Sequence, residues 1–378
     1  MSGQDPHIDK ALGPVLGSPN RFRLALFGFN FRAGLVMSSF EGVPQATWEE
    51  SLRVARAADR MGLEALIPLA RWQPYSSLGT GGRGFEPFTW AAALASATER
   101  IGLFATFIVP TVHPVLGAKM AATIDHVSGG RFGLNLVSGW QPSEIAMFGS
   151  STLDHDERYR VSDEWVTLAK RLWTETEPFD FEGAYYDAPA VTSEPKPLQQ
   201  PYPLLMSAGI SPAGRAFAAR HTDLVFAVVE EESERAATVA ELKRLAREEH
   251  GKEILVFTHG NVICRDSDEE AQALYDRVYH ELGDWEAGRN VLQTLMGHSQ
   301  TIDWEAFEIR RLLESTIRGF FAYPLVGTPL RIAGEMARLA EAGFDGLAIS
   351  MPDHDDGLAR LERQILPLLV EAGLRVAL

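Results

Sequence analysis

Residues 101–140 read IGLFATFIVPTVHPVLGAKMAATIDHVSGGRFGLNLVSGW, and this stretch decides the expected architecture. Residues 101–110 form a nearly continuous apolar run, which is typical of a strand buried on both faces. A helix is expected to begin at His113–Pro114 and to end at Gly129–Gly130, and residues 131–139 read as the next strand. A strand, a helix and a second strand in succession indicate a parallel βαβ unit.

The same alternation continues along the chain outside this stretch. The expected strands are residues 23–29, 64–70, 101–110, 131–139, 204–209, 224–229, 254–263 and 346–351. Eight such units fit an α/β fold of the (β/α)8 TIM barrel type, with a doubly wound open sheet as the competing architecture. A long insertion, residues 140–201, follows the fourth strand, and extra helices over about 268–320 precede the eighth. Residues 1–20 are expected to be a flexible tail, and residues 21–378 a single barrel domain.

Composition and charge limit the classes of partner. The chain has 378 residues and a formal net charge of −16, which argues against nucleic acid or an anionic membrane as the main partner. The only cysteine, Cys264, cannot form an internal disulfide, so a reducing compartment, the cytoplasm, is expected. No run is long enough to span a membrane. Two Asp-His-Asp tripeptides lack metal-ligand spacing, so no metal site is expected.

Several polar residues lie where barrel strands end, which is where such barrels carry their chemistry. Thr106 and Asn135 interrupt apolar strands, so each either bonds neighbouring backbone or faces a ligand at the barrel mouth. Ser211 opens a helix after a strand, and its free N–H groups favour a phosphate, with an ordinary turn as the alternative. His113 is a candidate proton donor or acceptor, or a helix-start residue. Trp140 would wall a pocket or belong to the core.

A glycine-rich loop invites comparison with dinucleotide-binding sites. Gly79, Gly81 and Gly84 fit the G-x-G-x-x-G spacing. A dinucleotide loop should follow its strand at once, however, whereas this expected strand ends near Ala70 and the next helix begins only at Pro87. The match is therefore interpreted as accidental. The loop, residues 71–86, and the 140–201 insertion are instead the two candidates for a lid.

Several longer motifs carry a resemblance to a known family. They are residues 105–140, HDERY at 155–159, PKPLQQP at 195–201, the Ser211–Gly214 turn and LVGTP at 325–329. Together they resemble the bacterial luciferase-like, flavin-dependent monooxygenases, with features of the dimethyl sulfone and pyrimidine monooxygenase branches. Members of that family are (β/α)8 barrels that bind FMN at the C-terminal ends of the strands.

The resemblance implies roles for individual residues. Thr106 and Asn135 would line the oxygen pocket beside the flavin as catalytic residues, with His113 as a further catalytic candidate. Phe107 and Trp140 would wall the pocket of the organic substrate. The residues expected to bind FMN are Leu69, Ala70, Thr106, Asn135, Glu144, Arg158, Tyr159, Gly209 and Ser211.

The resemblance also implies a reaction. Oxygen would add to reduced FMN, and the resulting flavin peroxide would transfer one oxygen atom to a small organic substrate, such as a sulfone, another organosulfur compound or a pyrimidine-like heterocycle. A separate NAD(P)H-dependent flavin reductase would supply the reduced FMN, and the chain would form a homodimer or homotetramer. The alternatives are a deazaflavin (F420)-dependent hydride-transfer enzyme, a non-catalytic flavin-binding protein, and a sugar-phosphate lyase or isomerase.

Overall fold

The computed structural model describes residues 7–377 except 152, 210, 298–302 and 305, and its central feature is a closed parallel barrel. Eight strands pair side by side, and the ring closes where β10 pairs with β11 and β13 pairs with β2. The predicted (β/α)8 barrel is confirmed, and the open-sheet alternative is wrong. The barrel strands in order are β2 (Arg23–Phe27), β3 (Ala65–Ile67), β4 (Gly102–Ile108), β5 (Phe132–Val137), β9 (Leu204–Ala208), β10 (Leu224–Phe226), β11 (Leu255–Cys264) and β13 (Gly346–Ser350).

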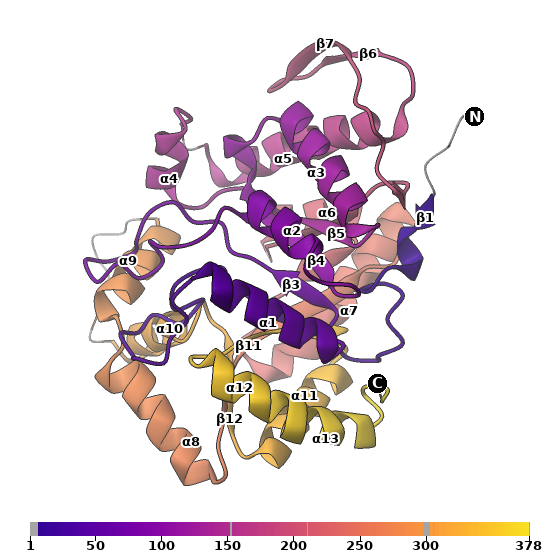
Figure 1. Cartoon of the computed structure of the whole chain (residues 1–378). Helices are drawn as coiled ribbons and strands as arrows, with labels where there is room; N and C mark the ends of the chain where they lie inside the picture. Colours follow the sequence, from indigo (N-terminus) through magenta and orange to yellow (C-terminus); the bar gives the residue numbers. More distant parts are fainter. Residues whose placement is uncertain (1–6, 152, 210, 298–302, 305, 378) are drawn as a thin grey trace.

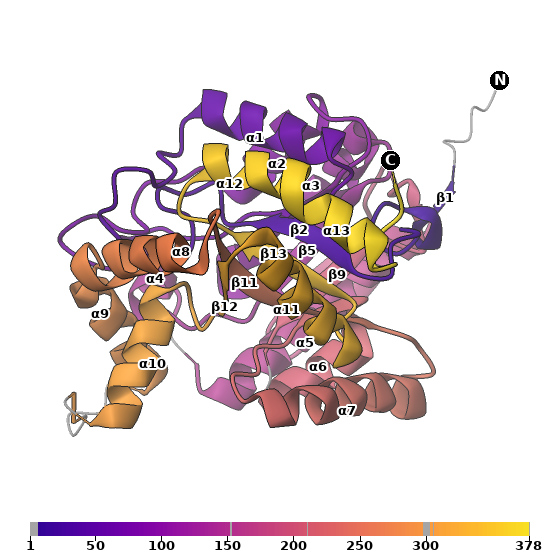
Figure 2. The same ribbon diagram turned by 90° about the horizontal axis from the view of Figure 1, so that it is seen from below.

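Helices surround this ring in both views (Figure 1, Figure 2). Local signals set their ends; the Thr47 hydroxyl, for example, accepts from the Glu50 N–H at 3.2 Å and begins the first helix. None of the described helices has the length and apolar character needed to cross a membrane. The outer helices are α1 (Trp48–Arg60), α2 (Pro87–Ala95), α3 (Pro114–Ser128), α5 (His155–Thr174), α6 (Pro212–His221), α7 (Glu232–His250), α11 (Pro329–Glu341), α12 (His354–Arg360) and α13 (Leu366–Glu371).

The insertion after β5 is built from helices, a hairpin and a short strand. It begins with the short helix α4 (Pro142–Met147), and after α5 an antiparallel hairpin, β6 (Phe179–Glu182) and β7 (Asp187–Val191), projects away from the barrel (Figure 1). The last strand of the insertion, β8 (Gln199–Gln200), pairs with a strand close to the N-terminus, β1 (Ile8–Asp9).

That pairing corrects the prediction of a flexible tail for residues 7–20. Lys10 Nζ lies 2.9 Å from the Asp223 carboxylate, and Val15 is fully buried among the side chains inside the barrel. The tail has enough apolar and charged contacts to pack under the barrel, which its high glycine and proline content concealed. Residues 1–6, which belong to the same prediction, lie outside the described residues.

The segment before β13 contains the predicted extra helices, followed by a strand. It contains α8 (Asp268–Tyr275), a π-helical turn (Asp276–Glu281), α9 (Trp285–Leu295), α10 (Phe307–Ile317) and the strand β12 (Tyr323–Gly327). The long strand β11 makes room for this addition, because its first half pairs with β13 and its second half with β12. In both views α8, α9, α10 and α4 lie on the same side of the barrel (Figure 1, Figure 2).

Candidate active site

A cavity of about 310 Å³ opens at the C-terminal ends of the barrel strands, and we refer to it as the mouth cavity. Most of its wall is apolar, and only a few polar side chains reach it, which is the usual make-up of a small-molecule site. Its lining residues are Phe27, Leu35, Leu69, Ala70, Arg71, Tyr75, Thr106, Ile108, Asn135, Val137, Trp140, Ala208, Gly209, Phe226, Val228, His259 and Phe320.

Thr106 and Asn135 face each other across neighbouring strands on this wall. They are register partners in β4 and β5, and both are nearly fully buried. The Thr106 hydroxyl donates to the Pro68 carbonyl at 2.5 Å and accepts from Asn135 Nδ2 at 3.0 Å. A carbonyl can only accept, so the hydroxyl proton lies toward Pro68 and the amide must present its nitrogen to Thr106. Asn135 Oδ1 is left buried without a partner, as a free acceptor for a ligand N–H.

A second polar group surrounds the end of β3. Glu144 is completely buried, and its Oε1 accepts from the Trp72 N–H at 2.7 Å and from the Gln73 N–H at 3.0 Å. The same oxygen lies 3.3 Å from Arg71 Nη2. The Arg71 guanidinium also stacks over the Tyr75 ring, 3.8 Å from its centroid. The exit of strand β3 is therefore held by the helix that follows strand β5.

The start of α6 forms a cradle of small residues next to Gly209, which lines the mouth cavity. Ser211 caps the helix and accepts from the Gly214 N–H at 3.2 Å. A Cβ on Gly209 would lie 2.4 Å from the Tyr159 hydroxyl oxygen, and one on Gly214 would lie 2.7 Å from it, so only glycine leaves this space open. Tyr159 also hydrogen-bonds the Ser211 side chain, and burial raises the pKa of its hydroxyl.

Arg158 stands beside this cradle with part of its guanidinium unused. Its Nη1 donates to the Gly139 carbonyl, whereas its Nε is buried without a partner. A helix N-terminus with free N–H groups, a tyrosine hydroxyl and an arginine is a donor set suited to a phosphate. The fit to FMN is good, because Gly209, which adjoins this donor set, lines the mouth cavity together with the unpaired Asn135 acceptor. Among the described residues, no group of three or more His, Cys, Asp or Glu side chains could hold a metal ion.

The cavity residues that sequence reasoning missed include four with polar or aromatic side chains at its rim and wall, namely Arg71, Tyr75, His259 and Phe320. His259 interrupts the apolar strand β11 just as Thr106 interrupts β4, so the same argument would have found it. Its Nε2 lies 2.9 Å from the Gly319 carbonyl, and burial lowers the pKa of the ring, which stays neutral at physiological pH. Phe320 and Arg71 lie in connecting segments, where no periodic pattern indicates direction.

Phe107 is not a wall of the mouth cavity, contrary to prediction. Side chains alternate along a strand, so the inward Thr106 and Ile108 force Phe107 outward. There its ring lies 4.9 Å from the Trp165 ring and 5.6 Å from the Phe88 ring, between α5 and α2. Trp140, the other predicted pocket residue, does line the cavity.

His113 is also placed away from the mouth cavity. It is an exposed helix cap whose Nδ1 accepts from the Val115 N–H at 3.3 Å, and its ring meets the Tyr186 ring edge-on. The catalytic prediction for His113 is therefore wrong, and the helix-start alternative holds. Leu69 and Ala70 line the cavity, and the Glu144 carboxylate accepts from the backbone N–H groups of Trp72 and Gln73. Contact of these three residues with a flavin stays a prediction.

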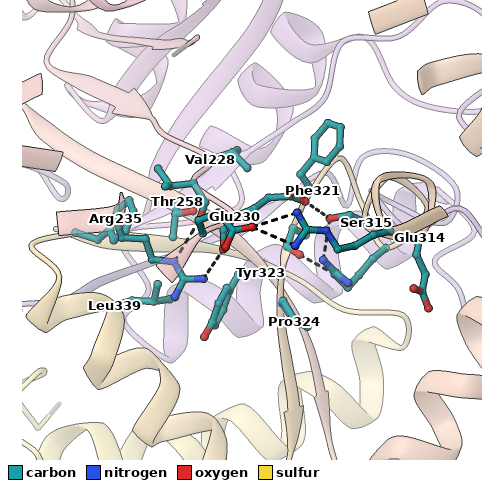
Figure 3. A pocket seen from close by; sticks show the side chains of 16 residues that line it. Val228, Glu230, Arg235, Thr258, Glu314, Ser315, Phe321, Tyr323, Pro324 and Leu339 are labelled. Carbon is teal, nitrogen blue, oxygen red and sulfur yellow. Dashed lines mark hydrogen bonds and ion pairs between the residues drawn. The ribbon is translucent and has the colours of Figure 1, made fainter. Parts of the chain in front are cut away.

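A second cavity, of about 270 Å³, lies on the outer side of strand β11 (Figure 3). Its polar groups satisfy one another: Ser315 Oγ donates to Glu230 at 2.6 Å, and Arg235 donates to the carbonyls of Val229 and Glu230 at 3.2 and 3.1 Å. None of the side chains on its wall has a buried polar atom without a partner. By contrast, Arg71 and Asn135 on the wall of the mouth cavity carry unpaired polar atoms, and we place the functional site there.

Known proteins resemble this chain over most of its length. An FMNH2-dependent dimethylsulfone monooxygenase of Pseudomonas putida is 29% identical over 348 residues, which cover 90% of this chain and 93% of that protein. The pyrimidine monooxygenase RutA of Cronobacter sakazakii is 33% identical over 338 residues, which cover 85% of this chain and 96% of that protein. The crystal structure of a long-chain alkane monooxygenase (LadA) has the same fold, with a TM-score of 0.83 at 20% identity and coverage of 94% of this chain and 92% of that one. A family model described as luciferase-like monooxygenase matches residues 31–346, and the chain therefore belongs to the luciferase-like monooxygenase family.

Proposed function

We propose that the protein is the oxygenase of a two-component, FMN-dependent monooxygenase system, which uses reduced FMN and O2 to oxygenate a small organic substrate. One observation carries the proposal: the apolar mouth cavity is lined by Asn135, whose Oδ1 is an unpaired acceptor, and by Gly209, which borders the donor set of Ser211 and Tyr159. The names of the dimethylsulfone and pyrimidine monooxygenase relatives support this reaction class. They also make a sulfone, another organosulfur compound or a pyrimidine-like heterocycle the substrate to test first.

The residues of the cavity have distinct tasks under this proposal. Ser211, Tyr159 and Arg158 would hold the phosphate through donated hydrogen bonds, and Gly209 and Gly214 leave room for the Tyr159 hydroxyl. Asn135 Oδ1 accepts from an N–H group of the reduced ring, and the Thr106–Pro68 bond keeps the amide in that orientation. Bound FMN supplies the activation of O2. The apolar walls keep water away from the reacting groups, which prevents loss of the oxygen as hydrogen peroxide.

We further propose that a separate NAD(P)H-dependent reductase delivers the reduced FMN. The glycine-rich loop, whose spacing resembles a dinucleotide-binding motif, has a structural role instead. Thr80 Oγ1 donates to Asp284 at 2.5 Å, and Gly79 and Gly81, both with positive φ, form the turn that carries Thr80. This role supports a nicotinamide site on a separate protein. Whether the loop moves as a lid stays a prediction. A homodimer or homotetramer in the cytoplasm completes the proposal, and light scattering on the purified protein tests the oligomeric state.

Two measurements test the proposed function. The purified protein should bind FMN, and with a flavin reductase, NADH and a panel of sulfones and pyrimidines it should place label from isotopically labelled O2 in the product. Substrate turnover in the absence of O2 would instead support the deazaflavin alternative. FMN binding with no oxidation of any panel member would support a non-catalytic flavin-binding protein.

A further inference from the structure

The starting observation is an arginine with unused donors inside the mouth cavity. The Arg71 side chain is only 3% exposed, yet its Nε and Nη1 atoms have no hydrogen-bond partner. Its Nη2 atom is occupied, since it donates to the Gln73 carbonyl at 3.2 Å and faces Glu144. Leaving a buried donor unpaired costs roughly 1–3 kcal/mol. A ligand that supplies acceptor atoms at Nε and Nη1 therefore gains more here than it would in water.

The position of this guanidinium is fixed before any ligand binds. It lies between the ion pair with Glu144 and the Tyr75 face, and its centre is 5.3 Å from the Trp140 ring. Glu144 is in turn held by two backbone N–H groups. A donor held in place in this way loses little conformational freedom on binding, so it can discriminate between ligands.

The charges around the cavity decide which kind of ligand fits. Arg71 is the one cation on the described wall of the cavity, and the fully buried Glu144 already balances it. Burial lowers the pKa of His259 and raises that of Tyr75, so both of these side chains are neutral. A substrate anion would add a buried charge with no cation left to balance it, which is costly. A neutral substrate with acceptor oxygens would satisfy Nε and Nη1 and leave the charges balanced.

We propose that Arg71 is the specificity-determining residue of the site, and that it binds the sulfonyl, sulfinyl or carbonyl oxygen of a neutral substrate while the site rejects sulfonates and carboxylates. This inference rests on the proposed function, because it describes the substrate of the same cavity. It assigns the substrate class from the free donors and the charge balance.

The test compares matched neutral and anionic probes on FMN-loaded protein. Calorimetry would measure the affinity for dimethyl sulfone against methanesulfonate, and for uracil against orotate. We expect the better neutral probe to bind at least tenfold more tightly than its anionic counterpart. The sulfone pair reports on sulfur–oxygen acceptors and the uracil pair on carbonyl acceptors, so the two sources of acceptor oxygen are distinguished. Equal or tighter binding of both anions, or binding of none of the four probes, would overturn the proposal.

Variants separate recognition by Arg71 from a merely structural role. Arg71→Lys keeps the charge beside Glu144 but lacks the Nε and Nη1 donors, so the affinity for the neutral probe should fall at least tenfold. If Arg71→Lys impairs folding, the double variant Arg71→Met with Glu144→Gln replaces it, because it removes the ion pair as a unit. The double variant should show the same loss of affinity for the neutral probe. Arg83→Met, an exposed arginine in the same loop, is the matched control and should change nothing.

The FMN affinity of the same variants, measured by flavin fluorescence, distinguishes a failure of the Arg71 proposal from a failure of the proposed function. FMN affinity should stay within about twofold of wild type in Arg71→Lys. If the FMN affinity of Arg71→Lys falls tenfold while its preference for neutral over anionic probes is kept, Arg71 is a flavin contact and the substrate role proposed for it is wrong. If the wild-type protein fails to bind FMN at all, the proposed function itself is wrong.

Discussion

Replacing Thr106 by valine tests the hydrogen-bond chain on which the candidate site depends. Valine has nearly the same volume, so the change removes a donor and an acceptor without opening a cavity. The Pro68 carbonyl loses its 2.5 Å bond, and Asn135 Nδ2 loses its 3.0 Å bond. Each buried polar group left unpaired costs roughly 1–3 kcal/mol. Asn135 borders the cavity and can bond water there, so most of the loss of stability comes from the unpaired Pro68 carbonyl. We expect the free energy of unfolding to fall by about 2 kcal/mol.

The same change should weaken FMN binding. Without the Thr106 hydroxyl, the Asn135 amide is free to rotate, and Oδ1 no longer faces the ligand in a fixed position. Such a loss of order is worth about one hydrogen bond, or roughly a tenfold rise in the dissociation constant. Denaturant unfolding of the apoprotein and fluorescence titration with FMN would measure the two effects.

Thr106→Ser is the matched control for these measurements. It keeps the hydroxyl and loses one methyl group, so it should cost about 1 kcal/mol in stability and leave FMN affinity within about twofold. The reasoning would be refuted if Thr106→Val were as stable as wild type and bound FMN equally well. It would also be refuted if the serine and valine variants weakened FMN binding to the same extent.

Three further predictions concern separate parts of the molecule. Gly214→Ala places a Cβ 2.7 Å from the Tyr159 hydroxyl and should raise the FMN dissociation constant at least tenfold in a fluorescence titration, whereas Gly334→Ala, in open space on α11, should not change it. Phe107→Leu should lower unfolding free energy by about 1 kcal/mol with unchanged FMN affinity, because its ring packs outside the barrel; a specific loss of FMN or substrate binding would contradict this. Burial lowers the pKa of His354 to about 3, so the unfolded chain takes up a proton below about pH 6.5 while the folded chain does not, and stability falls as the pH drops from 6.5 toward 3. Between pH 6.5 and 5 this loss should be on the order of 2 kcal/mol, and an unfolding series in which His354→Gln kept the full pH dependence would contradict the assignment.

The barrel could be predicted from sequence because strand and helix periods leave regular traces. The buried run of β4 and the capped helix after it define one unit, and every other barrel strand repeats that pattern. Thr106 and Asn135 were found for the same reason, since a polar residue in an apolar strand must have a partner. Applying the two-residue alternation to Thr106 would also have placed Phe107 on the outer face.

The remaining parts of the site depend on contacts between segments that are distant in sequence. Arg71 lies in the loop after β3, and its side chain is oriented by Glu144, which lies in the insertion after β5. The packing of residues 7–20 likewise depends on distant segments. Strand β1 pairs with β8, and Lys10 bonds Asp223, which lies 213 residues further along the chain. Local propensity carries no information about such pairs, so these features emerged only from the three-dimensional arrangement.

One short segment after β5 connects the two ends of the candidate site. The Gly139 carbonyl accepts from Arg158 at the phosphate end, and Glu144 holds Arg71 at the opposite end. Trp140 stands between them as part of the cavity wall. Gly139 has a φ of +92°, and a Cβ there would lie 3.0 Å from Ile145, so this turn requires glycine. The same turn positions Arg158, the proposed phosphate contact, and Arg71, the proposed substrate contact. A change that shifts its backbone should therefore impair FMN binding and substrate discrimination together, whereas changes at Arg71 or Ser211 alone should separate them.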